Sequence, residues 1–128
     1  MKILLPVLFA SCLLAASCGR DEDTIVAGKG GNATLKVNPS HPGAVIMDCM
    51  VYIEYNSEDR PLDNAYDDSV KCILENGKPI ATFPGLKKGN YYLYGFGIDT
   101  AGTHKVKGGT KHTITEEKEQ SINLPVSD

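Results

Sequence analysis

The sequence of 128 residues predicts an all-β protein, a single Greek-key β-sandwich of about seven strands. Apolar and polar residues alternate in several short segments, a period that is typical of half-buried strands. Clusters of Gly, Pro, Asn and Asp separate these segments at roughly the 8–12-residue spacing of sandwich strands. No segment shows the apolar stripe of an amphipathic helix.

The first two predicted strands cover residues 33–37 and 47–55. A run of turn-forming residues, 38–43, separates them. In the second strand the alternation predicts an inner face that consists of Met47, Cys49, Val51, Ile53 and Tyr55.

A polar loop, residues 56–69, follows the second strand. Loops of this length are uncommon in compact domains and often carry a function. Further strands are predicted at residues 70–74, 80–83, 91–98, 111–115 and 121–126, with a turn-rich connection at 99–109. Asn76-Gly77 predicts a two-residue hairpin turn. Gly95 and Gly97 indicate a bulge or a close approach of another backbone.

The N-terminus is predicted to be a targeting segment. Residues 1–17 join a basic start to an apolar stretch shorter than the roughly 20 residues of a membrane-spanning helix. Leu14-Ala15-Ala16-Ser17-Cys18 resembles the lipobox of bacterial lipoproteins, although Ala15 stands where that family usually has Leu. The resemblance implies that Cys18 is acylated and becomes the new N-terminus. The alternatives are an ordinary secretory signal and an uncleaved anchor helix.

Residues 18–32 are predicted to form a flexible, acidic and glycine-rich tether. Its acidic run, residues 21–23, resembles the export signal after the lipidated cysteine in surface lipoproteins of Bacteroidetes-type bacteria. This implies an outer-membrane lipoprotein exposed at the cell surface, and the alternative is the periplasmic face of that membrane. Because the net charge is −3, anionic lipids would not attract the protein, so acyl chains must hold it there.

Residues 81–93 read A-x-F-x-x-L-x-x-G-x-Y-x-L. This motif resembles the signature of transthyretin-like (prealbumin-like) sandwiches, which include carboxypeptidase regulatory-like domains and the B-type repeats of collagen adhesins. The resemblance covers roughly residues 33–126, and it implies the fold of a domain at 33–128 but no chemistry. It implies that Gly89 turns the chain. It also implies that the apolar members point inward: Ala81, Phe83, Leu86, Tyr91 and Leu93. Pro79 departs from the family, which has Gly there.

Cys49 and Cys72 remain in the domain once the signal peptide is removed and Cys18 carries lipid. Both lie in predicted strands, and two cysteines outside the cytosol can pair. Neighbouring or facing strands would bring their Cα atoms near the roughly 5.5 Å of a disulfide. The alternative is two free thiols packed as small apolar side chains.

Two groups of residues are candidates for a recognition surface. The long loop contributes Glu58, Asp59, Asp63, Tyr66, Asp67 and Asp68. The strands contribute tyrosines that the alternation turns outward, Tyr52, Tyr92 and Tyr94. The alternatives for the loop are a solvated segment and a calcium site, although its acids do not match a calcium-loop pattern. The alternative for the tyrosines is that they are ordinary half-buried strand residues.

The chemistry of the sequence favours a binding module over an enzyme. A negative net charge argues against a nucleic-acid partner. The histidines are scattered and no nucleophile or metal-ligand spacing stands out, so we expect no catalytic residue, metal or cofactor. We expect a non-enzymatic, lipid-anchored envelope protein that binds a protein or glycan partner or assists a larger complex. The alternatives are a purely structural spacer and a metal-binding or hydrolytic member of the same fold.

Overall fold

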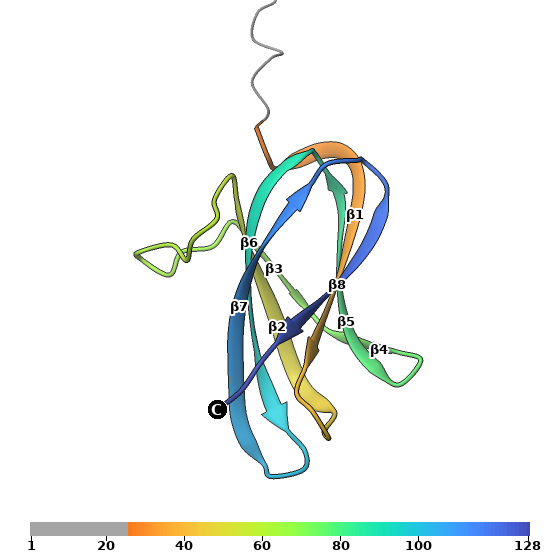
Figure 1. Ribbon diagram of the computed structural model, residues 1–128, viewed down its shortest axis with the longest axis vertical. Coiled ribbons are helices and arrows are strands. Elements are labelled where there is room, and N and C mark those ends of the chain that lie inside the picture. Colours follow the sequence, from red (N-terminus) through yellow and green to blue (C-terminus); the bar gives the residue numbers. More distant parts are fainter. Residues whose placement is uncertain (1–25) are drawn as a thin grey trace, which may run out of the picture.

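Two open four-stranded sheets pack face to face in the structure, a computed structural model that describes residues 26–128 (Figure 1). The predicted signal peptide, Cys18 and the acidic run of the tether lie outside the described residues. The eight strands are β1 (Lys29–Ser40), β2 (Ile46–Tyr55), β3 (Asp68–Lys71), β4 (Ile73–Glu75), β5 (Lys78–Leu86), β6 (Gly89–Asp99), β7 (His104–Ile114) and β8 (Glu119–Pro125). No helix within residues 26–128 is long and apolar enough to cross a membrane.

The strand order is β4-β5-β1-β8 in one sheet, called here the β1 sheet, and β3-β2-β6-β7 in the other, the β2 sheet. Neighbouring strands are antiparallel except β1 and β8, which run parallel over seven residue pairs. The all-β sandwich expected from the alternation is therefore confirmed.

The core lies between the inner faces of the two sheets, where alternate residues of each strand are buried. Every apolar member of the motif at residues 81–93 points inward as expected, and Gly89 takes a φ of 141°. Tyr91 is fully buried, and its hydroxyl accepts a hydrogen bond from the Gly28 amide (2.8 Å) and donates one to the Lys87 carbonyl (2.8 Å). One side chain thus connects the entry of β1 to the turn before β6.

A bulge in β2 corrects the predicted inner face of that strand. Met47 was expected inside, but it is 49% exposed and Ile46 is buried instead. Asp48 has a φ of 51°, a left-handed conformation that Asp tolerates, and the β2–β6 register shifts between Met47 and Met50. The extra residue reverses the alternation, so only the part of the prediction from Cys49 onward is right.

Gly97 on β6 provides the space for this bulge. A Cβ at residue 97 would collide with the side chains of Ile46 and Cys49. A Cβ at Gly95 would meet Leu124 Cδ2 at 2.7 Å. The sequence predicts a bulge or a close approach of another backbone at these glycines, whereas the closest neighbours are side chains and the bulge lies in the facing strand β2.

The predicted strand at 70–74 is in fact two strands in different sheets. β3 pairs with β2 and β4 pairs with β5, and only Cys72 separates them. An extended chain that changes sheet keeps its alternation, so the sequence pattern does not show the break. The Asn76-Gly77 turn is confirmed, with φ of 54° and 80° and Glu75 paired with Lys78.

Three other boundaries differ from the sequence prediction. β1 begins at Lys29, so residues 29–32, expected in the tether, lie in a strand whose Lys29 pairs with Leu86. β7 begins at His104, inside the segment expected to be turns, because a long β6 carries pairing as far as Asp99. The long loop spans residues 56–67, since its last two predicted residues belong to β3.

Candidate recognition surface

The outer face of the β2 sheet carries a group of aromatic rings. Tyr52 on β2 lies directly opposite Tyr94 on β6, with ring centroids 6.5 Å apart. Phe96, two residues further along β6, stacks on Tyr52 at 5.9 Å with an interplanar angle of 18°. Strand geometry explains this, because residues two apart in a strand share a face and cross-strand neighbours touch.

The long loop between β2 and β3 folds back onto these rings. Tyr66 lies 5.4 Å from Tyr52 and 6.0 Å from Tyr94, nearly parallel to the latter at 17°. The Arg60 guanidinium lies 5.1 Å from the centroid of Tyr94, within cation–π range. We call Tyr52, Tyr66, Tyr94 and Phe96 the aromatic cluster. The loop and the tyrosine face, expected as two separate candidates, form one continuous surface.

Hydrogen bonds within the loop hold its backbone. Asp67 accepts the amide of Tyr55 (2.7 Å) through its side chain and donates its own amide to the Ile53 carbonyl (2.9 Å). Asp63 accepts the amide of Ala65 at 3.0 Å, an Asx-type turn. The first of these contacts closes the base of the loop, and the second shapes its distal half.

The remaining predicted acids do not all lie beside the aromatic cluster: Glu58 and Asp59 are in the loop, whereas Asp68 on β3 is paired with the buried Ile53 and faces the other sheet. Glu58 faces Lys111 on β7 (3.6 Å) and Asp68 faces Lys29 on β1 (3.3 Å), both as exposed or half-exposed ion pairs. Asp59 is exposed, and its amide donates to the Ser57 hydroxyl. Exposed pairs of this kind contribute little stability. These ion pairs therefore do little to hold the loop in place, and Glu58 and Asp59 add exposed negative charge to it.

Tyr92 lies apart from the aromatic cluster. It is half-buried and on the same outer face, but its hydroxyl occupies the space above Gly109 on β7, where a Cβ would collide with it. Glu54, its cross-strand neighbour on β2, was not among the predicted residues. Burial raises the pKa of Glu54, and the adjacent Asp67 carboxylate raises that pKa further.

Two buried oxygens mark the contact between loop and sheet. The Tyr66 hydroxyl and Glu54 Oε1 are inaccessible and have no hydrogen-bond partner among the described residues. Burial of the hydroxyl raises the pKa of Tyr66, while Arg60 opposes that shift. The loop thus packs closely enough to remove polar atoms of both partners from water.

A concavity of about 390 Å³ adjoins the aromatic cluster. Its lining consists of Tyr94, Phe96, Lys105, Val106, Lys107 and Asp128. The exposed ring of Phe96 therefore lies beside two lysines of β7, which gives this end of the surface a basic border. Within residues 26–128, no group of three or more His, Cys, Asp or Glu side chains is placed to hold a metal ion.

Sequence reasoning found most of this surface but missed Phe96, Arg60 and Glu54. The first had a signal: Phe96 follows Tyr92 and Tyr94 at intervals of two and so shares their outward face. Arg60 had none, since its contact depends on the path of the loop.

No protein-family model matches the chain, and a search of curated proteins finds no significant match.

Proposed function

We propose that the protein is a non-enzymatic recognition module that binds a protein partner through the aromatic cluster and the loop at residues 56–67. The observation that carries the proposal is the packing of Tyr66 on Tyr52 and Tyr94, which joins the loop to the sheet. Each aromatic pair contributes roughly 0.5–1.5 kcal/mol beyond the burial of its area, so this packing holds the loop against the rings.

The composition of the surface fits a protein partner. Tyr, Phe, Met and Arg are enriched at protein interfaces, and Tyr and Arg are over-represented among the residues that dominate binding energy. Here Met50 and Phe96 are cross-strand neighbours on the same face, and Arg60 lies on Tyr94. Leu62 is a fully exposed apolar side chain on the loop. Rings already packed on one another lose little conformational freedom when a partner binds.

We also propose that the chain is a surface-exposed outer-membrane lipoprotein with a transthyretin-like Greek-key domain. The lipobox-like segment before Cys18 and the acidic run after it support the location, and the inward placement of the motif at residues 81–93 supports the domain type. Cys18→Ala should move the protein from the membrane fraction to the soluble fraction of cells. Retention of this variant in the membrane, with unprocessed wild type as the main species, would contradict lipid anchoring.

Site-specific photo-crosslinking in intact cells tests the binding surface. A photoreactive amino acid at Phe96 or Leu62 should give a discrete protein adduct, because both side chains are exposed on the proposed surface. The matched control is the same probe at Thr82, on the outer face of the other sheet. Adducts of equal yield at all three positions, or at none, would contradict the proposal. A glycan ligand would instead appear as array binding that Tyr94→Ala abolishes.

A further inference from the structure

Cys49 and Cys72 are direct cross-strand partners. β2 and β3 pair Val51 with Val70 and Met50 with Lys71, and the next pair in this antiparallel register is Cys49 with Cys72. The Cys72 amide donates to the Cys49 carbonyl at 2.9 Å, which extends the ladder to this pair. Hydrogen-bonded antiparallel partners have Cα atoms about 5.5 Å apart, inside the range that a disulfide spans.

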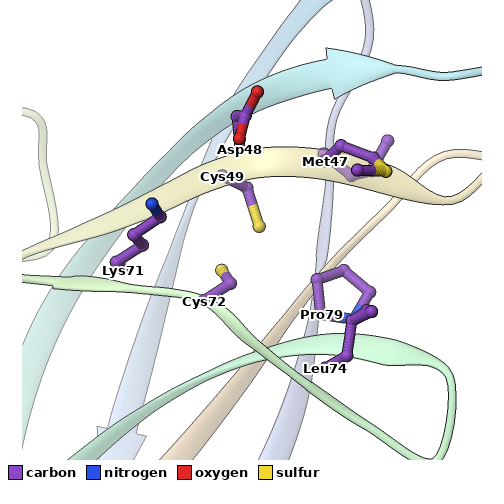
Figure 2. Close-up of a pocket in the computed structure, with 8 residues that line it drawn as sticks. Met47, Asp48, Cys49, Lys71, Cys72, Leu74 and Pro79 are labelled. Atoms are coloured by element: carbon purple, nitrogen blue, oxygen red, sulfur yellow. The ribbon is translucent and has the colours of Figure 1, made fainter.

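The two side chains point toward one another on the inner side of the sheet. Figure 2 shows both sulfur atoms in the space between β2 and the segment that carries Cys72. Both are thiols in the structure, and a hydrogen bond between them lowers the pKa of Cys49 and raises that of Cys72. Cys49 lies inward because it continues the alternation of the buried Val51 and Ile53.

The thiols differ in accessibility. Cys49 is only 2% exposed, whereas Cys72 is half-buried at the edge of the core. A hollow of about 150 Å³ borders both, lined also by Met47, Lys71, Leu74 and Pro79 (Figure 2). An external reagent can therefore reach Cys72 more readily than Cys49.

We propose that Cys49 and Cys72 form an intramolecular disulfide by exchange with the disulfide of an oxidised dithiol oxidoreductase. The bond would join β2 to the crossover between β3 and β4, where the chain passes from one sheet to the other. It would also close a covalent ring over residues 49–72, which include the loop at residues 56–67. Oxidation in cells rests on the proposed export from the cytosol, but the chemistry of the pair does not.

The exchange balances in two steps. The pair loses one proton and shares the other through its hydrogen bond. With that proton on Cys49, the accessible Cys72 sulfur attacks one sulfur of the oxidant, so that a mixed disulfide forms and the oxidant's S–S bond breaks. The Cys49 thiolate then attacks Cys72 Sγ and expels the oxidant as a dithiol. The two protein thiols lose two electrons and two protons, and the oxidant gains them.

Peptide mapping of the mature protein purified from membranes tests the bond, with oxidised glutathione as the probe oxidant. Cleavage after Lys71 places the two cysteines in separate tryptic peptides. After oxidation and alkylation, these peptides should appear as one linked species, lighter by two hydrogen atoms than their sum. Reduction should lower the Tm by about 10 °C, because the unfolded chain is then no longer restrained by the covalent ring over residues 49–72.

The double variant Cys49→Ala/Cys72→Ala is the matched control and should show no redox-dependent Tm. Cys49→Ser should accumulate a mixed disulfide with glutathione at Cys72, whereas Cys72→Ser should leave Cys49 unmodified in the folded protein. Alkylation of both wild-type thiols after oxidation, or a reducible dimer linked through Cys72, would overturn the proposal. If the oxidised wild-type protein contains the disulfide but binds no partner, the disulfide proposal stands and only the proposed function is contradicted.

Discussion

The two sheets share one core but have very different outer faces. On the β2 sheet the outer face carries the aromatic cluster and is partly covered by the loop. On the β1 sheet it carries mostly polar and charged side chains: Thr34, Lys36, Asn38, Thr82, Ser121 and Asn123. The paired Ile73 and Ile80 at the β4 edge are its apolar exception. No Tyr or Phe within residues 26–128 lies on that outer face.

The difference between the two outer faces shows which apolar residues the core requires. The β1 sheet shows that a strand of this sandwich needs apolar residues only on its inner face, since Lys36 and Thr82 alternate with the buried Val37 and Phe83. The outward rings of the β2 sheet are therefore additional to the needs of the core. A clustered apolar surface beyond those needs is a mark of an interaction site.

The largest effect should come from the inner face. Phe83→Ala removes a buried ring from the core and should lower the free energy of unfolding by about 3–5 kcal/mol. Thr82→Ala, one residue away on the outer face, should change it by less than about 0.5 kcal/mol. Urea denaturation measures both. A similar cost for the two variants would mean that the outer face of the β1 sheet is also covered.

The second comparison sets an inner tyrosine against an outer one. Tyr91→Phe leaves the buried Gly28 amide and the Lys87 carbonyl without their partner and should cost about 1–3 kcal/mol. Tyr66→Phe removes a hydroxyl that has no hydrogen-bond partner within residues 26–128, so it should be neutral or slightly stabilising. The same denaturation experiment compares them. A larger loss for Tyr66→Phe would show that its hydroxyl is satisfied in solution.

The smallest effect concerns pH. The pKa of Glu54 is raised above its ordinary 4.5, so the stability tied to its protonated form is complete below pH 4.5 and is lost as the pH rises through the raised value. Glu54→Gln should therefore raise the Tm at pH 7 more than at pH 4. Asp67→Asn removes the facing charge and should reduce this difference. An equal Tm gain at both pH values would contradict the account.

Local alternation predicted most of the core. Residues such as Val51, Ile53, Tyr91 and Leu93 occupy the inner face because a period of two is set by the strand itself. The error at Met47 and the missed break at Cys72 have another cause. A bulge and a change of sheet depend on the partner strand, for instance on the space that Gly97 leaves, and that information is distributed over distant residues.

The candidate recognition surface was predictable in parts and not as a whole. Tyr52 and Tyr94 could be placed outward from the pattern, and the length of the loop marked it as a candidate. The contact of Tyr66 with both rings depends on the loop's backbone path, which hydrogen bonds at Asp63 and Asp67 shape. Those bonds are visible only once the loop is folded.

The parallel pairing of β1 with β8 also determines how the domain resists mechanical force. A pull on the chain that precedes Lys29 acts along the axis of β1, which lies between β5 and β8 in its sheet. Seven residue pairs with β8, and the pairs with β5 on the other side, are then loaded together in shear. An interior strand loaded along its axis cannot be peeled off one hydrogen bond at a time. The domain should therefore resist unfolding by a force applied between the start of β1 and the end of β8.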